Sequence, residues 1–357
     1  MLRKIRILVV DDSAFMRKAL TRMLASDQMI EVVDTASDGR EGYEKTMRLR
    51  PDVVTLDVNM PGMDGLTALG LIMRDCPTPV LMLSSLTAQG GEVTLRALDM
   101  GAVDFIDKTS ARSAMEILTI AGELITKVKA VAHVDISKML ATAPPAPSAS
   151  PPAQKTLPAA KCRYEVVAIG TSTGGPPALQ SILSRMPRDL PVPVIVVQHM
   201  PVGFTASLAA RLDGLSQLYI TEAVDGDTAV PGRCLIAPSG LHMTLGRNAD
   251  GYCVRLSDKP EGLLHRPSVD VLMESVANAA GSRGLGVILT GMGSDGAAGM
   301  KKLHDAGGTT LAQDEQTCVV YGMPRVAVEM GGVDRSIPLG RMHTAILEEL
   351  GIQGSYA

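Results

Sequence analysis

Three aspartates stand at the ends of two short apolar segments near the start of the chain. Asp11 and Asp12 follow Ile5–Val10, and Asp57 ends the run 53–57. Such short, β-branched segments predict buried parallel strands, and ligands of open α/β sheets gather beyond the carboxyl ends of the strands. Taken singly, each aspartate is better explained as a polar loop residue. Together they would repel one another without a positive charge among them, and oxygen ligands of this kind predict a hard cation such as Mg²⁺, which often bridges to a phosphoryl group.

A second candidate site begins with the segment Gly-Thr-Ser-Thr-Gly-Gly-Pro-Pro at 170–177. It follows an apolar run and precedes a helical pattern, and Ser172 is the serine of its G-x-S-x-G motif, which is typical of a turn that exposes a nucleophile. The prolines favour a clean helix start, and backbone N–H groups there would stabilise a developing oxyanion. A glycine-rich phosphate-binding loop is the alternative. The segment lacks the lysine of one such motif and the G-x-G-x-x-G spacing of the other.

A serine nucleophile needs a base and a group that orients the base. His199 ends the apolar run 194–198, and Asp295 lies just beyond the run 285–290. With Ser172 they fall at the carboxyl ends of predicted parallel strands, on the common edge that a catalytic triad requires. The chain order Ser, His, Asp differs from that of the α/β-hydrolases, so their fold does not follow from the motif. His242 and His265 are weaker candidates, and His265 could line a substrate cleft or cap a turn. His133 and His304 are expected to be solvated, and His343 belongs to the C-terminal tail.

Alternating strands and helices must position these residues. In the first part of the chain the pattern predicts strands at 5–10, 30–35, 53–57, 79–84 and 102–106, with helices at 14–26, 39–48, 64–75, 91–100 and 113–131. In the second part it predicts strands at 164–169, 193–198, 285–290 and 309–312, with helices at 176–186, 204–212, 268–280 and 297–305. Alternation of this kind predicts parallel sheets covered on both faces. Shorter runs between 234 and 257 predict an antiparallel hairpin.

The two parts are separated by 141–160, which is almost all Ala, Pro and Ser and cannot form a core. We therefore expect an α/β protein of two domains, at 1–132 and 161–357, joined by a linker at 133–160. The first is predicted to be a flavodoxin-like (βα)5 domain, and the second a doubly wound, mainly parallel domain with the hairpin. Each is long enough to bury its own core.

Composition excludes several classes of protein. The net charge of −4 provides no field that would favour nucleic acid or acidic lipid. The five cysteines are scattered and form no C-x-x-C pair, which fits a reducing cytosol better than a disulfide framework or a zinc site. No signal peptide or membrane-spanning segment is predicted. We expect a cytoplasmic protein that is not inserted in a membrane.

The acidic cluster and two residues at later strand ends resemble the site of a response-regulator receiver domain: Asp11, Asp12, Asp57, Ser84 and Lys108. The resemblance implies that Asp57 accepts a phosphoryl group from a histidine kinase. It also implies that Asp11, Asp12 and Asp57, with the backbone carbonyl of Asn59, hold Mg²⁺, which neutralises the phosphoryl oxygens.

The same resemblance gives roles to the residues that sense the phosphoryl group. Lys108 would pair with the acyl phosphate, the Ser84 hydroxyl would bond to it, and Phe105 would repack as the switch moves. One position departs from the family pattern, because receivers usually have proline after this lysine and Thr109 stands there.

A receiver, a linker and three motifs together resemble the CheB family of chemotaxis protein-glutamate methylesterases: G-T-S-T-G-G-P at 170–176, Q-H-M-P at 198–201 and T-G-M-G-S-D-G at 290–296. The resemblance implies that Ser172 is the nucleophile, that His199 is the general base and then acid, and that Asp295 orients the imidazole. It also places oxyanion stabilisation near Thr173 and at the backbone N–H of Met292. No metal or other cofactor is expected at this second site.

The implied activity is hydrolysis of glutamyl methyl esters on methyl-accepting chemotaxis receptors, with release of methanol, and deamidation of certain receptor glutamines. We expect the unphosphorylated receiver to cover the Ser172 edge and phosphorylation to weaken that docking. The alternative is a non-enzymatic response regulator whose second domain binds a ligand, a partner or DNA. A DNA-binding output predicts a basic recognition helix, whereas acidic residues slightly outnumber basic ones in 161–357.

Overall fold

The computed structural model describes residues 3–84, 88–108, 114–136, 162–249 and 251–352. The chain divides into two compact units, Met1–Ala141 and Thr142–Ala357. Most of the predicted linker and Thr109 lie outside the described residues.

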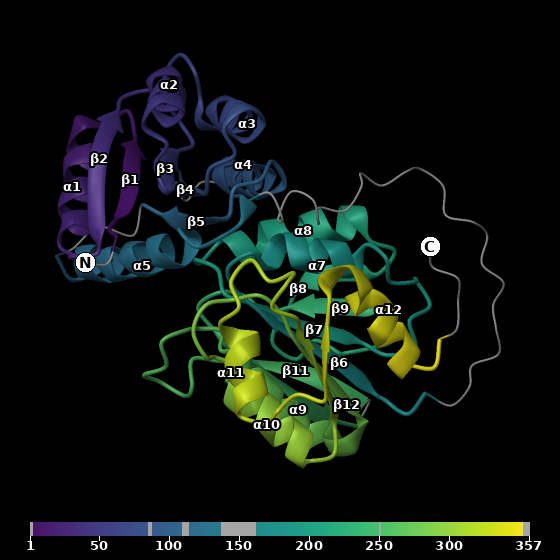
Figure 1. Ribbon diagram of the computed structural model, residues 1–357. Helices are drawn as coiled ribbons and strands as arrows, with labels where there is room; N and C mark the ends of the chain where they lie inside the picture. The colour runs from purple at the N-terminus through teal and green to yellow at the C-terminus, as the bar shows by residue number, and fades with distance from the viewer. Residues whose placement is uncertain (1–2, 85–87, 109–113, 137–161, 250, 353–357) are drawn as a thin grey trace. The chain divides into compact units, whose positions relative to one another are not determined.

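The first unit is a five-stranded parallel sheet with strand order β2-β1-β3-β4-β5 (Figure 1). Its strands are β1 (Ile5–Val10), β2 (Ile30–Ala36), β3 (Val53–Asp57), β4 (Val80–Ser84) and β5 (Asp104–Asp107). Its helices are α1 (Ala14–Ala25), α2 (Gly39–Leu49), α3 (Gly65–Asp75), α4 (Ala88–Asp99) and α5 (Ala114–Val131). The central strand β3 is buried at every position, as expected for a strand covered on both faces.

Three helices of this unit, α1, α2 and α3, begin where a side chain satisfies a free backbone N–H group. Ser13, Asp38 and Asp64 each precede a helix and accept a hydrogen bond from the N–H three residues on. The turns that follow β1 and β3 are therefore fixed, and these turns carry the acidic residues.

The second unit has a seven-stranded parallel sheet of order β14-β13-β12-β6-β7-β9-β8 and a separate antiparallel pair, β10-β11. The strands are β6 (Val166–Thr171), β7 (Val194–Gln198), β8 (Tyr219–Glu222), β9 (Arg233–Ile236), β10 (His242–Asn248), β11 (Gly251–Ser257), β12 (Gly284–Ile288), β13 (Thr309–Gln313) and β14 (Arg335–Ile337). The helices are α7 (Gly175–Leu183), α8 (Phe204–Leu215), α9 (Val269–Ala280), the short 3₁₀ helix η1 (Gly281–Arg283), α10 (Ala297–Asp305), α11 (Met323–Glu329) and α12 (Leu339–Glu349).

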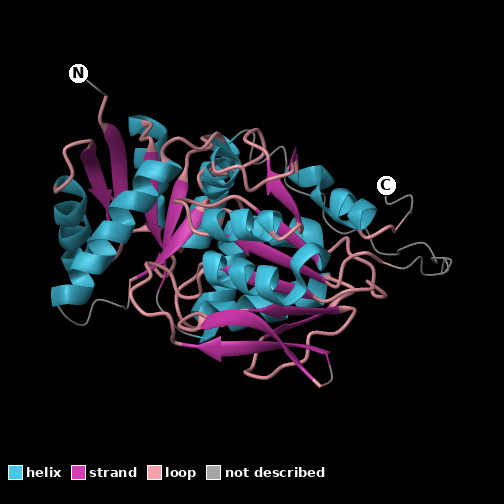
Figure 2. Ribbon diagram, turned by 90° about the horizontal axis from the view of Figure 1, so that it is seen from below, coloured by secondary structure: helices cyan, strands magenta, loops and turns pink. Residues whose placement is uncertain are grey.

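The hairpin packs on helix α9, where the Leu245 N–H donates to Ser275 Oγ (2.8 Å). Figure 2 shows the two hairpin strands along the outer side of the helices. A single apolar cluster joins the hairpin, α9 and the central strands of the sheet. The core of the unit therefore lies directly beneath the loops that follow β6, β7 and β12.

The predicted α/β class, with two parallel sheets and a hairpin, is confirmed. Some elements differ from the prediction. The segment at 233–236 was expected in the hairpin region, but as β9 it pairs in parallel with β7 and β8. The edge strands β8 and β14 and the helices α11 and α12 were not predicted. His343 was expected in a C-terminal tail, but it lies on α12 and is buried.

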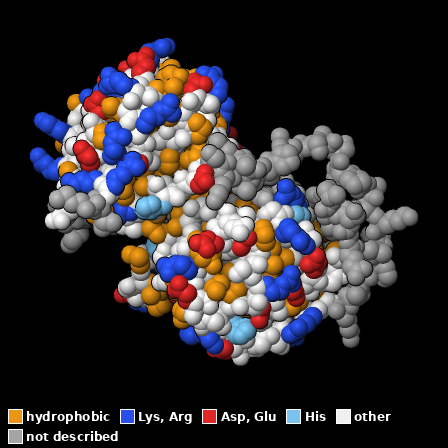
Figure 3. Space-filling view, viewed as in Figure 1, with side chains coloured by type: hydrophobic (Ala, Val, Ile, Leu, Met, Phe, Trp, Pro, Cys, Tyr) orange, Lys and Arg blue, Asp and Glu red, His pale blue; other side chains and the backbone are white. Residues whose placement is uncertain are grey.

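Among the described residues, no helix combines the length and apolar character needed to cross a bilayer. On the face shown in Figure 3, acidic and basic side chains of the second unit are interspersed.

Candidate functional site

The three aspartates of the first unit meet at the carboxyl ends of β1 and β3, which are neighbours in the sheet. One carboxylate oxygen from each of Asp11, Asp12 and Asp57 lies within 4.8 Å of the others. Asp11 and Asp57 are buried, and Asp12 is exposed. Lys108 Nζ is 2.6 Å from Asp57 Oδ2 and 3.2 Å from Asp11 Oδ2. A single ammonium thus serves two buried carboxylates.

The negative charge of this cluster is incompletely balanced. Burial raises the pKa of Asp57, although Lys108 acts in the opposite direction. Burial also disfavours the charged form of Lys108, but hydrogen bonds and charge from Asp57 and Asp11 raise its pKa overall. The Asn59 N–H donates to Asp57 Oδ1 at 3.3 Å. An all-oxygen cluster with surplus negative charge fits a hard divalent cation such as Mg²⁺.

Of the other predicted residues of this site, Ser84 and Lys108 lie at the same end of the sheet, and Phe105 lies within β5. Ser84 ends β4, is buried, and accepts a hydrogen bond on its hydroxyl from Thr94 Oγ1 (2.7 Å). Phe105 is buried in β5, and its carbonyl accepts a hydrogen bond from Lys127 Nζ (2.7 Å). The Lys108 N–H donates to the Ser84 carbonyl at 2.8 Å. Their sensing roles remain predictions.

In the second unit Ser172 and His199 follow two neighbouring strands, β6 and β7. The Ser172 N–H donates to the Thr290 carbonyl (3.0 Å), which fixes the turn against the loop after β12. The His199 N–H donates to the Thr171 carbonyl (3.1 Å). The Gln198 amide nitrogen donates to both the Ser172 and His199 carbonyls, each at 2.9 Å. Gln198 therefore holds the two turns in a fixed relation.

Glycines make room for this arrangement. A side chain at Gly175 would overlap the Gln198 amide, and a Cβ at Gly291 would lie 2.8 Å from the Ser172 Cβ and would overlap Met323. Gly174 has φ +76°, a conformation that L side chains rarely adopt. The glycines of the G-x-S-x-G motif and of the loop after β12 are thus needed for close approach around Ser172.

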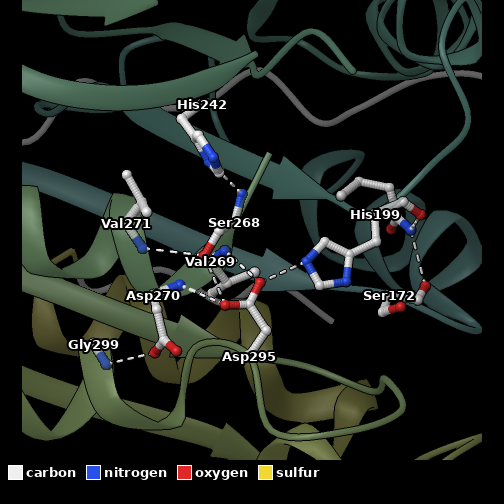
Figure 4. A network of polar contacts seen from close by, with 10 residues as sticks. Ser172, His199, His242, Ser268, Val269, Asp270, Val271, Asp295 and Gly299 are labelled. Atoms are coloured by element: carbon white, nitrogen blue, oxygen red, sulfur yellow. Dashed lines mark hydrogen bonds and ion pairs between the residues drawn. The ribbon is translucent and has the colours of Figure 1, made fainter. Parts of the chain in front are cut away.

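Asp295, in the loop before α10, binds the His199 ring (Figure 4). His199 Nε2 lies 2.7 Å from Asp295 Oδ2. The carboxylate also accepts hydrogen bonds from Ser268 Oγ (2.8 Å), Val269 N (2.7 Å) and Asp270 N (3.0 Å). Burial alone would raise the pKa of Asp295, but His199 and the backbone N–H groups hold it well below its usual value. Asp295 is therefore a fixed anion at neutral pH.

The second nitrogen of the His199 ring, Nδ1, does not face Asp295. Nδ1 is buried and unpaired in the described part of the chain, and in Figure 4 it lies on the Ser172 side of the ring. The His265 ring stacks on His199 with centroids 4.0 Å apart and planes 18° from parallel. The nitrogen available to a serine proton is thus Nδ1, whereas chymotrypsin uses Nε2.

Two predicted supporting residues lie in the loops beside Ser172. Thr173 is buried and its carbonyl accepts a hydrogen bond from Thr290 Oγ1 (3.0 Å). Met292 follows Gly291, where an added Cβ would lie 2.8 Å from the Ser172 Cβ. Their predicted part in oxyanion stabilisation is compatible with these positions and is not tested by them.

Sequence reasoning missed the start of helix α9. Ser268 and the two N–H groups after it bind Asp295, although no motif joins them. The only signal was a serine at the first position of the predicted helix 268–280, which is typical of an N-cap. His242, a weaker candidate for the base, is instead buried behind Ser268, and burial lowers its pKa.

Comparison with known proteins gives matches to both units. Residues 167–346 match the family model of the CheB methylesterase, and residues 7–119 match that of the response regulator receiver domain. A protein-glutamate methylesterase/protein-glutamine glutaminase of Oleidesulfovibrio alaskensis is 47% identical over 96% of this chain and 98% of its own. A protein-glutamate methylesterase/protein-glutamine glutaminase of Geobacillus kaustophilus is 46% identical over 98% of this chain and 100% of its own. The crystal structure of the Thermotoga maritima CheB methylesterase catalytic domain is 41% identical, covering 52% of this chain and 98% of that one, with a TM-score of 0.51.

Proposed function

The chain belongs to the CheB methylesterase family and carries a response regulator receiver domain, and from this we propose that it is a protein-glutamate methylesterase and protein-glutamine glutaminase with Ser172 as nucleophile. The observation that carries this assignment is the His199–Asp295 pair beside Ser172, with Nδ1 of His199 buried and unpaired. Its substrates are glutamyl methyl esters of chemoreceptors, and certain receptor glutamines.

In the first half of the reaction, Ser172 Oγ attacks the ester carbonyl carbon and its proton passes to His199 Nδ1. Asp295 stabilises the imidazolium that forms and keeps the ring in place. The oxyanion binds near Thr173 and the Met292 N–H, and one such donor contributes about 10²–10³-fold. His199 then returns the proton to the departing methoxide, which leaves as methanol. A glutamine substrate releases ammonia at the same step.

In the second half, His199 takes a proton from water, and the resulting hydroxide attacks the acyl-enzyme. The tetrahedral intermediate collapses to free glutamate and Ser172, whose oxygen recovers the proton from His199. General base and acid catalysis of this kind contributes about 10²–10⁴-fold. Because His199 transfers protons in both halves of the reaction, substitution of His199 should slow acylation and deacylation alike.

The receiver supplies control. Asp57 accepts the phosphoryl group from a histidine kinase through its carboxylate oxygen. Asp11, Asp12 and Asp57, with the Asn59 carbonyl, would hold Mg²⁺, whose charge neutralises phosphoryl oxygens when it is bound. Lys108 and Ser84 then bind the acyl phosphate, and Phe105 repacks. The unphosphorylated receiver limits access to Ser172, so residues 161–357 alone should turn over faster than the unphosphorylated full chain. Equal rates would argue against simple occlusion.

The decisive test measures methanol release from a methyl-esterified chemoreceptor by the wild-type chain and by Ser172→Ala. We expect the substitution to abolish turnover. Substantial residual turnover would place the nucleophile elsewhere. A serine-directed fluorophosphonate should label the wild-type protein at Ser172, and failure to label would favour a second domain that only binds a ligand or partner.

A further inference from the structure

The start of helix α9 contributes most of the hydrogen bonds to Asp295, although it carries none of the three proposed catalytic residues. Ser268 Oγ and Asp270 N–H donate to one carboxylate oxygen, at 2.8 and 3.0 Å. Val269 N–H donates to the other at 2.7 Å, beside the bond to His199. Three of these four donors therefore come from one helix end, where the helix dipole also favours a negative charge.

Of the three donors at this helix end, Ser268 is the one that acts through a side chain. Its hydroxyl donates a hydrogen bond to Asp295 and accepts one from Val271 N (3.3 Å), which caps the helix. Since a hydroxyl has one proton, the cap and the bond to Asp295 together fix its orientation. The side chain is buried and has no freedom to exchange these bonds for water.

A second buried group fixes Ser268 from behind. The Ser268 N–H donates to His242 Nδ1 (3.2 Å), so the proton of this ring is on Nε2, which faces the Pro260 carbonyl at 3.2 Å. Figure 4 shows His242, Ser268, Asp295 and His199 as a continuous series of polar contacts that ends on the Ser172 side. The backbone and the hydroxyl of Ser268 are thus both held, one by His242 and the other by Asp295.

We propose that Ser268 is a positioning residue for the reaction at Ser172, which acts by fixing the Asp295 carboxylate that orients His199. This inference rests on the proposed esterase function. Without the hydroxyl, one carboxylate oxygen keeps only the Asp270 N–H, and the carboxylate gains freedom to rotate away from His199. Because Ser268 is buried and not exposed to a substrate, the loss should fall on kcat and leave KM unchanged.

The experiment compares substitutions of Ser268 in the full chain, with methanol release from a methyl-esterified chemoreceptor as the readout. Ser268→Ala should lower kcat about tenfold, which corresponds to about 1.4 kcal/mol in the barrier. Ser268→Gly, which an N-cap tolerates, should show the same loss. Ser268→Thr keeps the hydroxyl and should restore most of the rate.

A double-mutant cycle separates positioning from a general structural effect. If Ser268 acts through Asp295, Ser268→Ala should cost nothing further in an Asp295→Ala background. An equal loss in both backgrounds, or full kcat in Ser268→Ala and Ser268→Gly, would overturn the proposal.

Ser275→Ala provides a matched control on the same helix. Ser275 is also buried, donates to the Leu272 carbonyl (2.6 Å) and accepts from the Leu245 N–H (2.8 Å), but it does not contact Asp295. This variant should lower the melting temperature and leave kcat unchanged. If it lowers kcat as much as Ser268→Ala does, the effect belongs to the helix as a whole. Turnover by Ser172→Ala would instead contradict the proposed function itself.

Discussion

Asp57 in the receiver is buried and Asp295 in the esterase unit is mostly buried. Asp57 is the last residue of β3, and Asp295 lies in the loop after β12. The pKa values of these two carboxylates shift in opposite directions. Asp57 shares one ammonium with Asp11 and accepts one long backbone hydrogen bond. Asp295 accepts four hydrogen bonds, two of them from backbone N–H groups.

The difference shows how the number of donors decides what a buried carboxylate can do. A carboxylate with too few donors keeps an unbalanced charge, so it can take up a cation and then a phosphoryl group. A carboxylate that accepts several hydrogen bonds stays ionised and fixed in place, so it can stabilise a positive charge that forms beside it. In the proposed function, the first arrangement receives the phosphoryl group and the second orients the catalytic histidine.

The largest expected effect comes from removing the charge of Asp295. Asp295→Asn should lower kcat of ester hydrolysis by about 10⁴-fold, as expected when the orienting anion of a triad is replaced. Asp270→Asn is the matched control, because its carboxylate accepts the Gly299 N–H (2.7 Å) and not a hydrogen bond from His199. Steady-state methanol release by both variants checks this. A comparable loss of kcat in Asp270→Asn would show that the effect of Asp295→Asn does not arise from its contact with His199.

A smaller effect is expected when the shared ammonium of the receiver is removed. Lys108→Ala should bind Mg²⁺ about 10-fold more tightly, because a positive charge close to two carboxylates opposes a cation there. Isothermal titration with Mg²⁺ measures this, and Lys45→Ala, which removes a lysine paired with Asp34 and Glu41, is the control. Unchanged or weaker binding by the Lys108 variant would mean that the negative charge of the cluster is already balanced.

The comparison also implies that the partner of Asp295 must be held as firmly as Asp295 itself. His265 stacks on the His199 ring, and a stacked pair of rings is worth about 0.5–1.5 kcal/mol. His265→Ala should therefore lower kcat by a few-fold. Leu264→Ala is the control, because it changes the neighbouring, almost fully exposed side chain and should have less effect. The rate of p-nitrophenyl acetate hydrolysis measures both variants. Equal rates for the wild type and His265→Ala would show that Asp295 orients the ring unaided.

The smallest effects concern stability and its dependence on pH. The raised pKa of Asp57 means that its favourable contribution is present below the unfolded value of 3.8 and is lost as pH rises through the folded pKa. Asp57→Asn should thus raise the melting temperature of the receiver at pH 7 without Mg²⁺, and the gain should vanish near pH 3.

Asp295 has the opposite sign, since its pKa is lowered. Its contribution is present above the unfolded value of 3.8 and is lost as pH falls through the folded pKa. Asp295→Asn should lower the melting temperature of the esterase unit at pH 7, and the deficit should shrink in strong acid. Scanning calorimetry of the full chain tests both variants, and shifts of the same sign would contradict the contrast.

The elements that carry the sites could be predicted because their signals are local. Short apolar runs that end in Asp57 or just before His199 predict a strand and the edge at which it stops. The weak edge strands were missed for the same reason: β8 has four residues and begins with the exposed Tyr219, so no apolar alternation marks it. The burial of His343 depends on α12 packing against α7, which its own segment does not show.

Contacts between distant residues could not be predicted from spacing. Ser268 and Asp295 are separated by 27 positions, and nothing in either segment indicates that one accepts from the other. The sequence also did not indicate which nitrogen of the His199 ring contacts Asp295, because either ring nitrogen can form such a hydrogen bond. Motifs identified the participants, whereas their orientation required the structure.

The glycines beneath Ser172 limit how this enzyme could be redesigned. Because side chains at Gly175 and Gly291 would overlap Gln198, Met323 or Ser172 itself, single substitutions at these glycines cannot reshape the surroundings of Ser172. A library that seeks new acyl substrates should therefore leave these two glycines fixed.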